Sequence, residues 1–321
     1  MSPSPSSRRK TAPKRKPAAA SVGTPVRVKR SRVVKTATTP AAKAKKKPPA
    51  LAYTDIDLTR WRDYDHVETG SLWQFDSRQK SNGHQLDYHG NCVPQILTQL
   101  LTRYTKAGET ILDLFLGSGT SAIEAVNLGR RAVGVELKHD MADYVRGKLG
   151  EQGKSREVRV IRGDSGSVKT AAPIRRALKE LSGREAADFV FLHPPYADII
   201  RFSELAEDLS NVNSTEEFLA MWDAVCHQAW EALAPGRFAA VVIGDKYADS
   251  ELIPLGFLCM AGMNRQGFKT KSIIVKNITG NEKAKGKTAN LWRYRALAGG
   301  FYIFKHEYVI VFQKPLKPGR R

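Results

Sequence analysis

Residues suited to binding a nucleoside lie between positions 111 and 136. An apolar run breaks into a turn at Gly117 and Gly119, where side chains would obstruct the backbone. A helix-forming segment and a second apolar run follow, and that run ends on Glu136. An acid about twenty positions beyond a glycine-rich strand-to-helix turn suits the hydroxyl pair of a ribose. We therefore expect a nucleoside-containing cofactor bound by Phe115, Gly117, Gly119, Thr120 and Glu136.

The glycine turn differs from the Gly-x-Gly-x-x-Gly pattern of dinucleotide sites. It reads Asp-x-Phe-x-Gly-x-Gly, beginning at Asp113. An acid at this point would repel a pyrophosphate, but it would hold an ammonium group such as that of S-adenosylmethionine. On the turn alone, a strand-to-helix connection of any α/β enzyme remains the alternative.

A second motif is the corner at His193, Pro194, Pro195 and Tyr196, which follows an apolar run that begins at Phe189. The two prolines fix the backbone in an extended shape, so the carbonyl of Pro194 is held in one direction. That carbonyl can accept a hydrogen bond from an exocyclic amine, and Tyr196 offers a ring face to a base. Simple chain termination after a strand is the alternative reading.

Together the two motifs resemble the DNA amino-methyltransferases, whose signature is Asp, Asn or Ser followed by Pro-Pro-Tyr. Both motifs occur in the family's order, and the resemblance covers about residues 85–313. It implies S-adenosylmethionine as cofactor and double-stranded DNA as partner. It also implies methyl transfer to the amino group of a flipped-out cytosine (N4) or adenine (N6). The catalytic residues would be His193, Pro194, Pro195 and Tyr196.

The first residue of the corner departs from the family pattern. By resemblance, this residue and the Pro194 carbonyl accept hydrogen bonds from the amine, whose lone pair is otherwise delocalised into the ring. A neutral His193 can accept one such bond, whereas a protonated one only donates. We therefore predict that activity falls below about pH 6.5. Ser here leans toward cytosine and Asp or Asn toward adenine, so His leaves the base open.

Two further cofactor contacts follow from the resemblance. Asn91, with His89 and Gly90, precedes the glycine turn where the family covers the methionine end of the cofactor. Capping of the helix at Pro94 is the alternative. Asp164 follows the third expected strand, where the family places an acid against the adenine amino group. A helix N-cap is the alternative for this residue.

Repeated strand–helix units predict an α/β fold with ligands at the carboxyl edge of its sheet. We expect a Rossmann-like seven-stranded methyltransferase sheet, mostly parallel with an antiparallel last strand and with helices on both faces. The expected strands after the first, which precedes the glycine turn, are 131–135, 157–161, 187–192, 237–243, 268–276 and 301–312. The expected helices are 96–105, 120–128, 138–149, 170–181 and 216–233.

Charge divides the chain. Residues 1–50 hold 15 of the 52 Lys and Arg and none of the 32 acidic residues. We expect residues 1–50 to be a disordered basic tail that neutralises nucleic-acid phosphates. A nuclear localisation signal or an inert extension are the alternatives. Residues 51–87 then form an arm packed on the core, residues 88–315 the methyltransferase domain, and residues 316–321 a C-terminal tail.

A basic insert is expected at about residues 265–300. From Arg265 to Arg295 it contains nine basic residues and one acid, with Asn277, Asn281 and Asn290 among them. Lys and Arg can hold phosphates, and Asn and Arg can read base edges. A solvated loop is the alternative. The expected nucleic-acid-binding residues are Lys283, Lys285, Lys287, Arg293 and Arg295.

Other features exclude function classes. The sequence contains no run of about eighteen apolar residues, so it predicts no membrane span. Cys92, Cys226 and Cys259 are far apart in the sequence, which argues against a metal site. The sequence contains no Pro-Cys dipeptide, and this argues against methylation of a cytosine ring carbon. We expect a cytoplasmic, nucleoid-associated protein, or a nuclear one in a eukaryote. A separate restriction endonuclease is compatible with this expectation as a partner. The alternatives are an RNA methyltransferase of the same fold and a catalytically decayed DNA-binding protein.

Overall fold

The structure, a computed structural model, describes residues 52–84, 90–248, 251–278 and 289–316. The predicted tail at 1–50 therefore lies outside the described residues, as do His89, Asn281 and the three expected DNA contacts at Lys283, Lys285 and Lys287. Among the described residues, no helix is long and apolar enough to cross a membrane.

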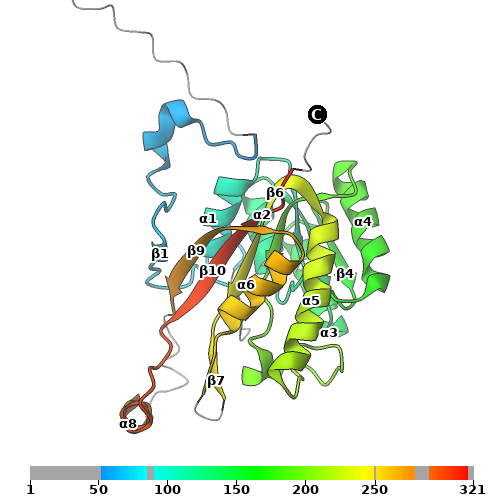
Figure 1. The fold of residues 1–321 in the computed structure, drawn as a ribbon. Helices are drawn as coiled ribbons and strands as arrows, with labels where there is room; N and C mark the ends of the chain where they lie inside the picture. Colours follow the sequence, from blue (N-terminus) through cyan, green and yellow to red (C-terminus); the bar gives the residue numbers. More distant parts are fainter. Residues whose placement is uncertain (1–51, 85–89, 249–250, 279–288, 317–321) are drawn as a thin grey trace, which may run out of the picture. The chain divides into compact units, whose positions relative to one another are not determined.

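The central sheet has eight strands in the order β1-β9-β10-β6-β5-β2-β3-β4 (Figure 1). All neighbours pair in parallel except β10, which is antiparallel to both β6 and β9. The predicted Rossmann-like class is confirmed. The strands are β1 (Leu72–Trp73), β2 (Thr110–Asp113), β3 (Arg131–Glu136), β4 (Val158–Arg162), β5 (Ala187–Leu192), β6 (Leu233–Ile243), β9 (Lys269–Asn277) and β10 (His306–Gln313), with a separate hairpin of β7 (Lys246–Ala248) and β8 (Glu251–Ile253).

Helices cover both faces of the sheet because successive strand residues point to opposite sides. Leu112 of β2 packs in one core with Trp222 and its neighbours on α4, α5 and α6. The preceding residue, Ile111, packs in a second core with α1, α2 and α3. The helices are α1 (Pro94–Tyr104), α2 (Thr120–Asn127), α3 (His139–Glu151), α4 (Val168–Ser182), α5 (Thr215–Ala232), α6 (Leu255–Arg265) and α8 (Ala289–Gly299), with short 3-10 helices η1 (Leu58–Tyr64) and η2 (Ala197–Ile199).

The eighth strand, absent from the prediction, comes from the arm. Leu72 and Trp73 pair in parallel with the end of β9, and Trp73 is buried. The Asn277 side chain then accepts a hydrogen bond from the Phe75 amide (2.8 Å) and donates to the Phe75 carbonyl (3.2 Å). Asn277 is therefore committed to the arm, and its expected role as a reader of base edges is wrong.

Two other boundaries differ from the sequence prediction. The last strand begins at His306 instead of Phe301, because its pairing with β9 starts where β9 ends, at Asn277. Residues 301–304 line a cavity instead. Helix α6 was not predicted, although Leu255, Cys259 and Met263 repeat at helical spacing and are fully buried.

Topology brings the ends of distant strands together. Parallel strands β2, β3 and β5 end at the same edge with Asp113, Glu136 and Leu192. Because β10 runs in the opposite direction, its first residues lie at this edge too. This carboxyl edge is where ligands bind in open α/β sheets.

Candidate active site

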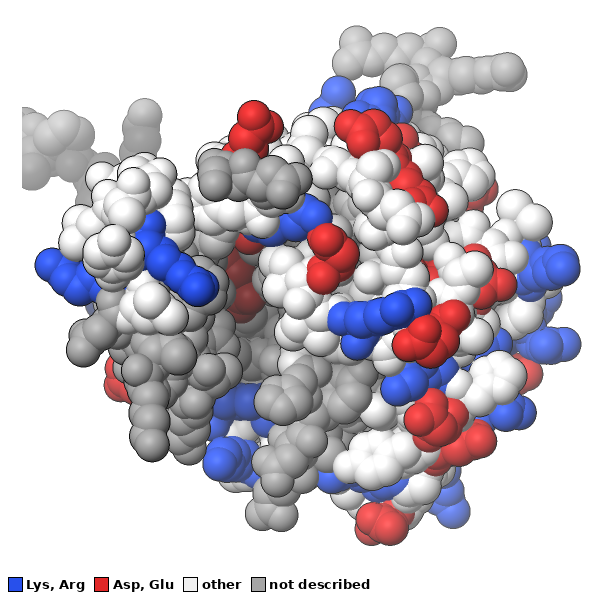
Figure 2. Space-filling view, turned by 90° about the horizontal axis from the view of Figure 1, so that it is seen from below, with Lys and Arg blue, Asp and Glu red and all other residues white. Residues whose placement is uncertain are grey.

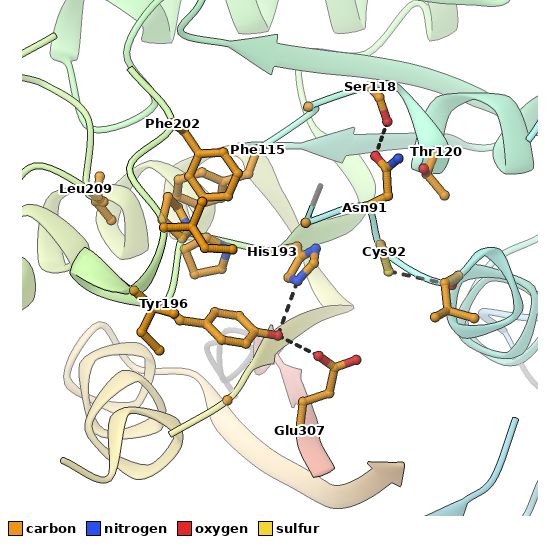
Figure 3. Close-up of a pocket in the computed structure, with 18 of the residues that line it drawn as sticks. Asn91, Cys92, Phe115, Ser118, Thr120, His193, Tyr196, Phe202, Leu209 and Glu307 are labelled. Carbon is orange, nitrogen blue, oxygen red and sulfur yellow. Dashed lines mark hydrogen bonds between the residues drawn. The ribbon is translucent and has the colours of Figure 1, made fainter. Parts of the chain in front are cut away.

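A cavity of about 820 Å³ lies at the carboxyl edge and is lined by both sequence motifs. Gly119 is not among its lining residues. Figure 3 shows Asn91, Phe115 and Thr120 around the same space as His193 and Tyr196. The predicted site residues that line the cavity are Asn91, Asp113, Phe115, Gly117, Thr120, Glu136, Asp164, His193, Pro194, Pro195 and Tyr196.

The glycine turn needs its glycines for backbone reasons. Gly117 and Gly119 have φ angles of 51° and 85°, in the left-handed region that favours glycine. A β-carbon on Gly119 would also lie 2.9 Å from Val145 Cγ1. Gly119 is the N-cap of α2. It affects the site indirectly, because its backbone conformation sets the direction in which α2 begins.

Glu136 is fixed by the same turn. Its carboxylate accepts hydrogen bonds from the amides of Gly117 (2.8 Å) and Lys138 (2.9 Å). Burial raises the pKa of the Glu136 carboxyl to about 7, against these two bonds, which lower it. The carboxylate therefore faces the cavity as a rigid acceptor that titrates near neutral pH.

Asp113 first shapes the turn itself. One carboxylate oxygen accepts from the Phe115 amide (2.8 Å) and the other from the Ser121 hydroxyl. Burial raises the pKa of the Asp113 carboxyl to about 6. A cation placed beside it would favour its ionised form, and the predicted contact to an ammonium group stays a prediction.

Neither Asn91 nor Asp164 is a helix cap. The N-cap of α1 is Val93, with no side-chain hydrogen bond, and that of α4 is Ser167. Both capping alternatives are therefore wrong. Asn91 Oδ1 accepts from the Ser118 hydroxyl, while its amide nitrogen is buried and has no partner among the described residues. Asp164 accepts from the Gly166 amide at 2.7 Å.

Arg78 is a site residue that the sequence analysis missed. It belongs to the arm, and its guanidinium donates to the His84 carbonyl (2.8 Å) and to the Thr120 hydroxyl at the start of α2 (3.2 Å). Its Nε is buried without a partner among the described residues, and the side chain lines the cavity. No sequence signal marks it, because only packing brings the arm to α2.

The Pro-Pro-Tyr corner ends in a chain of polar contacts (Figure 3). His193 Nε2 lies 3.3 Å from the Tyr196 hydroxyl, which donates to Glu307 of β10 at 2.7 Å. Lys276 of β9 donates to the other Glu307 oxygen at 3.0 Å. The sequence analysis missed Glu307, and its assignment of Lys276 to a DNA-binding insert is wrong, since that side chain is buried in this ion pair.

Burial changes the expected titration of His193. Desolvation lowers the pKa of its imidazole, against the Glu307 charge, which raises it. Removal from water likewise raises the pKa of the Tyr196 hydroxyl well above 10. The ring of His193 therefore stays neutral to a lower pH than an exposed imidazole does, and the expected loss of activity moves below pH 6.5.

Gly244 makes the path from the corner to β10 possible. It directly follows β6, which lies between β5 and β10 in the sheet. A β-carbon on Gly244 would lie 2.8 Å from Tyr196 Cε2. The missing side chain lets the Tyr196 ring cross the end of β6 and reach Glu307.

Another part of the cavity lining is aromatic. The Tyr247 ring stacks on Phe304 with centroids 4.9 Å apart and an angle of 18°, and Phe301 lies at 5.2 Å. All three line the cavity. This part of the cavity offers ring faces, and it is formed by residues that follow β6 and precede β10.

The basic insert is divided among several elements. Arg265 ends α6, and its Nη2 donates to both carboxylate oxygens of Asp223 (2.7 and 3.0 Å), so this exposed residue belongs to a helix and not to a loop. Arg293 and Arg295 lie on α8 and are exposed. In Figure 1, α8 projects beyond the carboxyl edge, on the same side as β7. Figure 2 looks onto this side, and its described atoms show acidic and basic side chains interspersed.

The cysteines and carboxylates offer no metal site within the described residues. No group of three or more His, Cys, Asp or Glu side chains there could hold a metal ion. All three cysteines are free and buried, and burial raises the pKa of the Cys92 thiol well above its usual value.

Known proteins match parts of the chain. A family model described as DNA methylase matches residues 10–146, and one described as conserved hypothetical protein 95 matches residues 93–223. The type II methyltransferase M.MthZI of Methanothermobacter thermautotrophicus is 35% identical over 57 residues (18% of this chain, 16% of that protein). M.BglI of Bacillus subtilis is 37% identical over 65 residues (20% and 18%).

A longer match reaches a larger relative. The probable type III restriction-modification enzyme HindVI Mod subunit of Haemophilus influenzae is 23% identical over 191 residues (58% of this chain, 22% of that protein). The chain thus spans about a fifth of the length of these curated relatives. Among solved structures, TrmN from Thermus thermophilus is similar with a TM-score of 0.45 and 17% identity, over 70% of this chain and 49% of that one.

Sequence matches and motifs agree. The DNA methylase model covers the glycine turn, and several of the relatives that match short stretches are type II methyltransferases. The fold is that expected from the motifs. These matches and the two motifs together support the DNA amino-methyltransferase family for this chain.

Proposed function

We propose that this protein transfers a methyl group from S-adenosylmethionine to the exocyclic amino group of a flipped-out cytosine or adenine in DNA. One observation carries the proposal. Two motifs far apart in the sequence, one suited to a nucleoside and one to an exocyclic amine, line the same cavity. A base must leave the helical stack to enter such a cavity.

The residues around the glycine turn fit the parts of S-adenosylmethionine, the methyl donor of this family. Glu136 offers acceptors for ribose hydroxyls, and Asp113 offers a negative charge to an ammonium group. Arg78 Nε and the Asn91 amide are buried donors without partners among the described residues, which suits a carboxylate. Asp164 is available to the adenine amine. When bound, the cofactor supplies an electrophilic methyl group.

The aromatic part of the cavity suits a base. Tyr247, Phe301 and Phe304 present aromatic rings, and base–aromatic stacking contributes about 1–3 kcal/mol per base. His193 and the Pro194 carbonyl would accept hydrogen bonds from the amine and so localise its lone pair. The same hydrogen bonds would orient the amine nitrogen toward the methyl group of the cofactor for direct displacement.

The test is methyl transfer itself. Labelled S-adenosylmethionine is incubated with duplex DNA, single-stranded DNA and RNA, and the digested nucleosides are identified by mass. We expect an N4-methylated cytosine or an N6-methylated adenine from DNA. Label confined to RNA would replace DNA by RNA as substrate. Bound cofactor without transfer to any of the three would leave a DNA-binding protein.

A matched pair of variants checks that transfer uses this cavity. Glu136→Gln removes the acceptor charge in the cofactor half and should reduce transfer at low cofactor concentration. Glu231→Gln makes the same change at an exposed position of α5 and should leave transfer unchanged. Equal activity in both variants would contradict a cofactor site at Glu136.

A further inference from the structure

The corner of this protein carries a ring with two chemically different nitrogens where the family signature has Asp, Asn or Ser. A neutral imidazole has one nitrogen that donates and one that accepts. Only an unprotonated nitrogen facing the base could replace the oxygen acceptor of those residues. The distribution of the single proton on His193 therefore decides whether the corner can work.

The contacts beyond His193 fix that proton. Glu307 sits opposite Lys276 in the antiparallel pairing of β9 with β10, and the two side chains form a buried ion pair. An ionised carboxylate is only an acceptor. The proton of the Tyr196 hydroxyl, 2.7 Å from Glu307, is therefore directed at Glu307.

The Tyr196 oxygen then has only lone pairs left for His193. His193 Nε2 lies 3.3 Å from that oxygen, so Nε2 must be the protonated nitrogen and Nδ1 the bare one. Figure 3 shows the second ring nitrogen turned away from Tyr196. His193 lines the cavity, and within the described residues its single hydrogen bond is the one at Nε2.

We propose that Glu307, held by Lys276, sets the tautomer of His193 through the Tyr196 hydroxyl, so that Nδ1 accepts a hydrogen bond from the amine of the target base. Glu307 and Lys276 are thus positioning residues for catalysis by His193. This inference rests on the proposed function for its consequence, while the tautomer is a property of the free protein.

Other groups around the corner are compatible with this arrangement. Cys92 lines the same cavity, and burial raises the pKa of its thiol well above the usual value, which favours the neutral form. Desolvation also lowers the pKa of the His193 imidazole, which favours its neutral form. The ion pair of Glu307 with Lys276 is therefore the charged contact that orders the chain of hydrogen bonds ending at His193.

The variant Glu307→Gln should reverse the tautomer. Lys276 donates to one Glu307 oxygen, so a glutamine there would keep its carbonyl toward Lys276 and turn its amide NH₂ toward Tyr196. The Tyr196 hydroxyl would then accept from that amide and donate to His193 Nε2. The His193 proton would move to Nδ1, where it blocks the amine.

Nitrogen NMR of the full chain with ¹⁵N-labelled histidine measures this directly. The His193 signals are assigned by their loss in His193→Asn. We expect a protonated Nε2 and a bare Nδ1 in the natural protein, and the reverse in Glu307→Gln. A protonated Nδ1 in the natural protein, or no change in the variant, would overturn the inference. Glu251→Gln, an exposed change on β8, is the matched control.

Kinetics test the consequence for methyl transfer. Glu307→Gln should lower kcat about 100-fold, the typical effect of losing one transition-state hydrogen bond, with little change in cofactor affinity. An Asn side chain offers its acceptor without a tautomer, so in a His193→Asn background the same change should have little effect. An equal loss in both backgrounds would mean a merely structural role for Glu307.

The two proposals can fail separately. Absence of methyl transfer in the natural protein, with Nδ1 bare, would refute the proposed function and leave the control of the tautomer intact. Methyl transfer with Nδ1 protonated would refute the control of the tautomer alone.

Discussion

Glu136 and Asp113 are buried carboxyls on the same side of the cavity, and burial raises the pKa of both toward neutral pH. Burial is the larger cause of the raised pKa of Glu136, and the negative charge of Asp113 raises that pKa further. Cofactor hydroxyls donate best to the ionised form of Glu136, so binding should release a proton from it. Its titration near pH 7 makes cofactor affinity depend on pH.

We predict that S-adenosylmethionine binds more tightly as pH rises from 6 to 8. Below the Glu136 pKa of about 7, the gain is at most about tenfold per pH unit for one proton, and it levels off above that value. Calorimetry at three pH values measures it. Glu136→Gln should bind more weakly and lose the dependence between pH 6.5 and 8, and a natural protein without that dependence would contradict the role of Glu136.

Arg78 gives a second prediction at this scale. The Nε of Arg78 has no partner among the described residues. If it donates to the cofactor carboxylate, Arg78→Met should weaken S-adenosylmethionine binding about tenfold or more, the cost of a hydrogen bond to a charged group. Methylthioadenosine lacks that carboxylate, so its affinity should not change. Arg176→Met, at an exposed position of α4, is the control. Equal weakening of both ligands would contradict the assignment.

At the scale of elements, α8 is an exposed part of the predicted basic insert. Its Leu291, Tyr294 and Leu297 side chains are 45%, 69% and 71% exposed, and Arg293 and Arg295 are exposed as well. Most of the described side chains of α8 therefore have no core to pack against. Together with its position beyond the carboxyl edge (Figure 1), this favours a nucleic-acid partner.

We predict that Arg293→Gln with Arg295→Gln lowers DNA affinity and its salt dependence. Removal of one phosphate interaction reduces the slope of log affinity against log salt by about 0.9, so a reduction of about 1 to 2 is expected in anisotropy titrations. Lys269→Gln with Lys271→Gln removes the same charge from the first residues of β9, at the opposite end from the cavity, and should have little effect. The hypothesis fails if both pairs behave alike.

At the scale of the whole molecule, most of the excess positive charge belongs to residues 1–50. They carry 15 positive charges, and the remaining 271 residues hold 37 basic and 32 acidic ones. The described surface at the carboxyl edge mixes both signs (Figure 2). Long-range attraction to DNA should therefore come mainly from the first fifty residues.

Deletion of residues 1–50 should weaken DNA binding strongly at low salt and flatten its salt dependence. Cofactor affinity should not change, because the residues proposed to bind it are all in the described part of the chain. Anisotropy at several salt concentrations and calorimetry measure the two quantities. An unchanged salt slope would support the alternative of an inert extension.

The sequence by itself determined the features that depend on neighbours in the chain. The glycine turn at Gly117 and Gly119, the acid ending β3 and the corner at Pro194 are local, and strand–helix alternation predicted the sheet class. Only the tertiary structure decided that Arg78, Gly244, Lys276 and Glu307 belong to the site. Their positions depend on strand pairing across the sheet and on the packing of the arm, which join residues far apart in the chain, such as Tyr196 and Glu307 at a separation of 111 positions. Because β10 runs antiparallel, its first residues meet the last residues of β6 and β9, and no local pattern in the chain records that meeting.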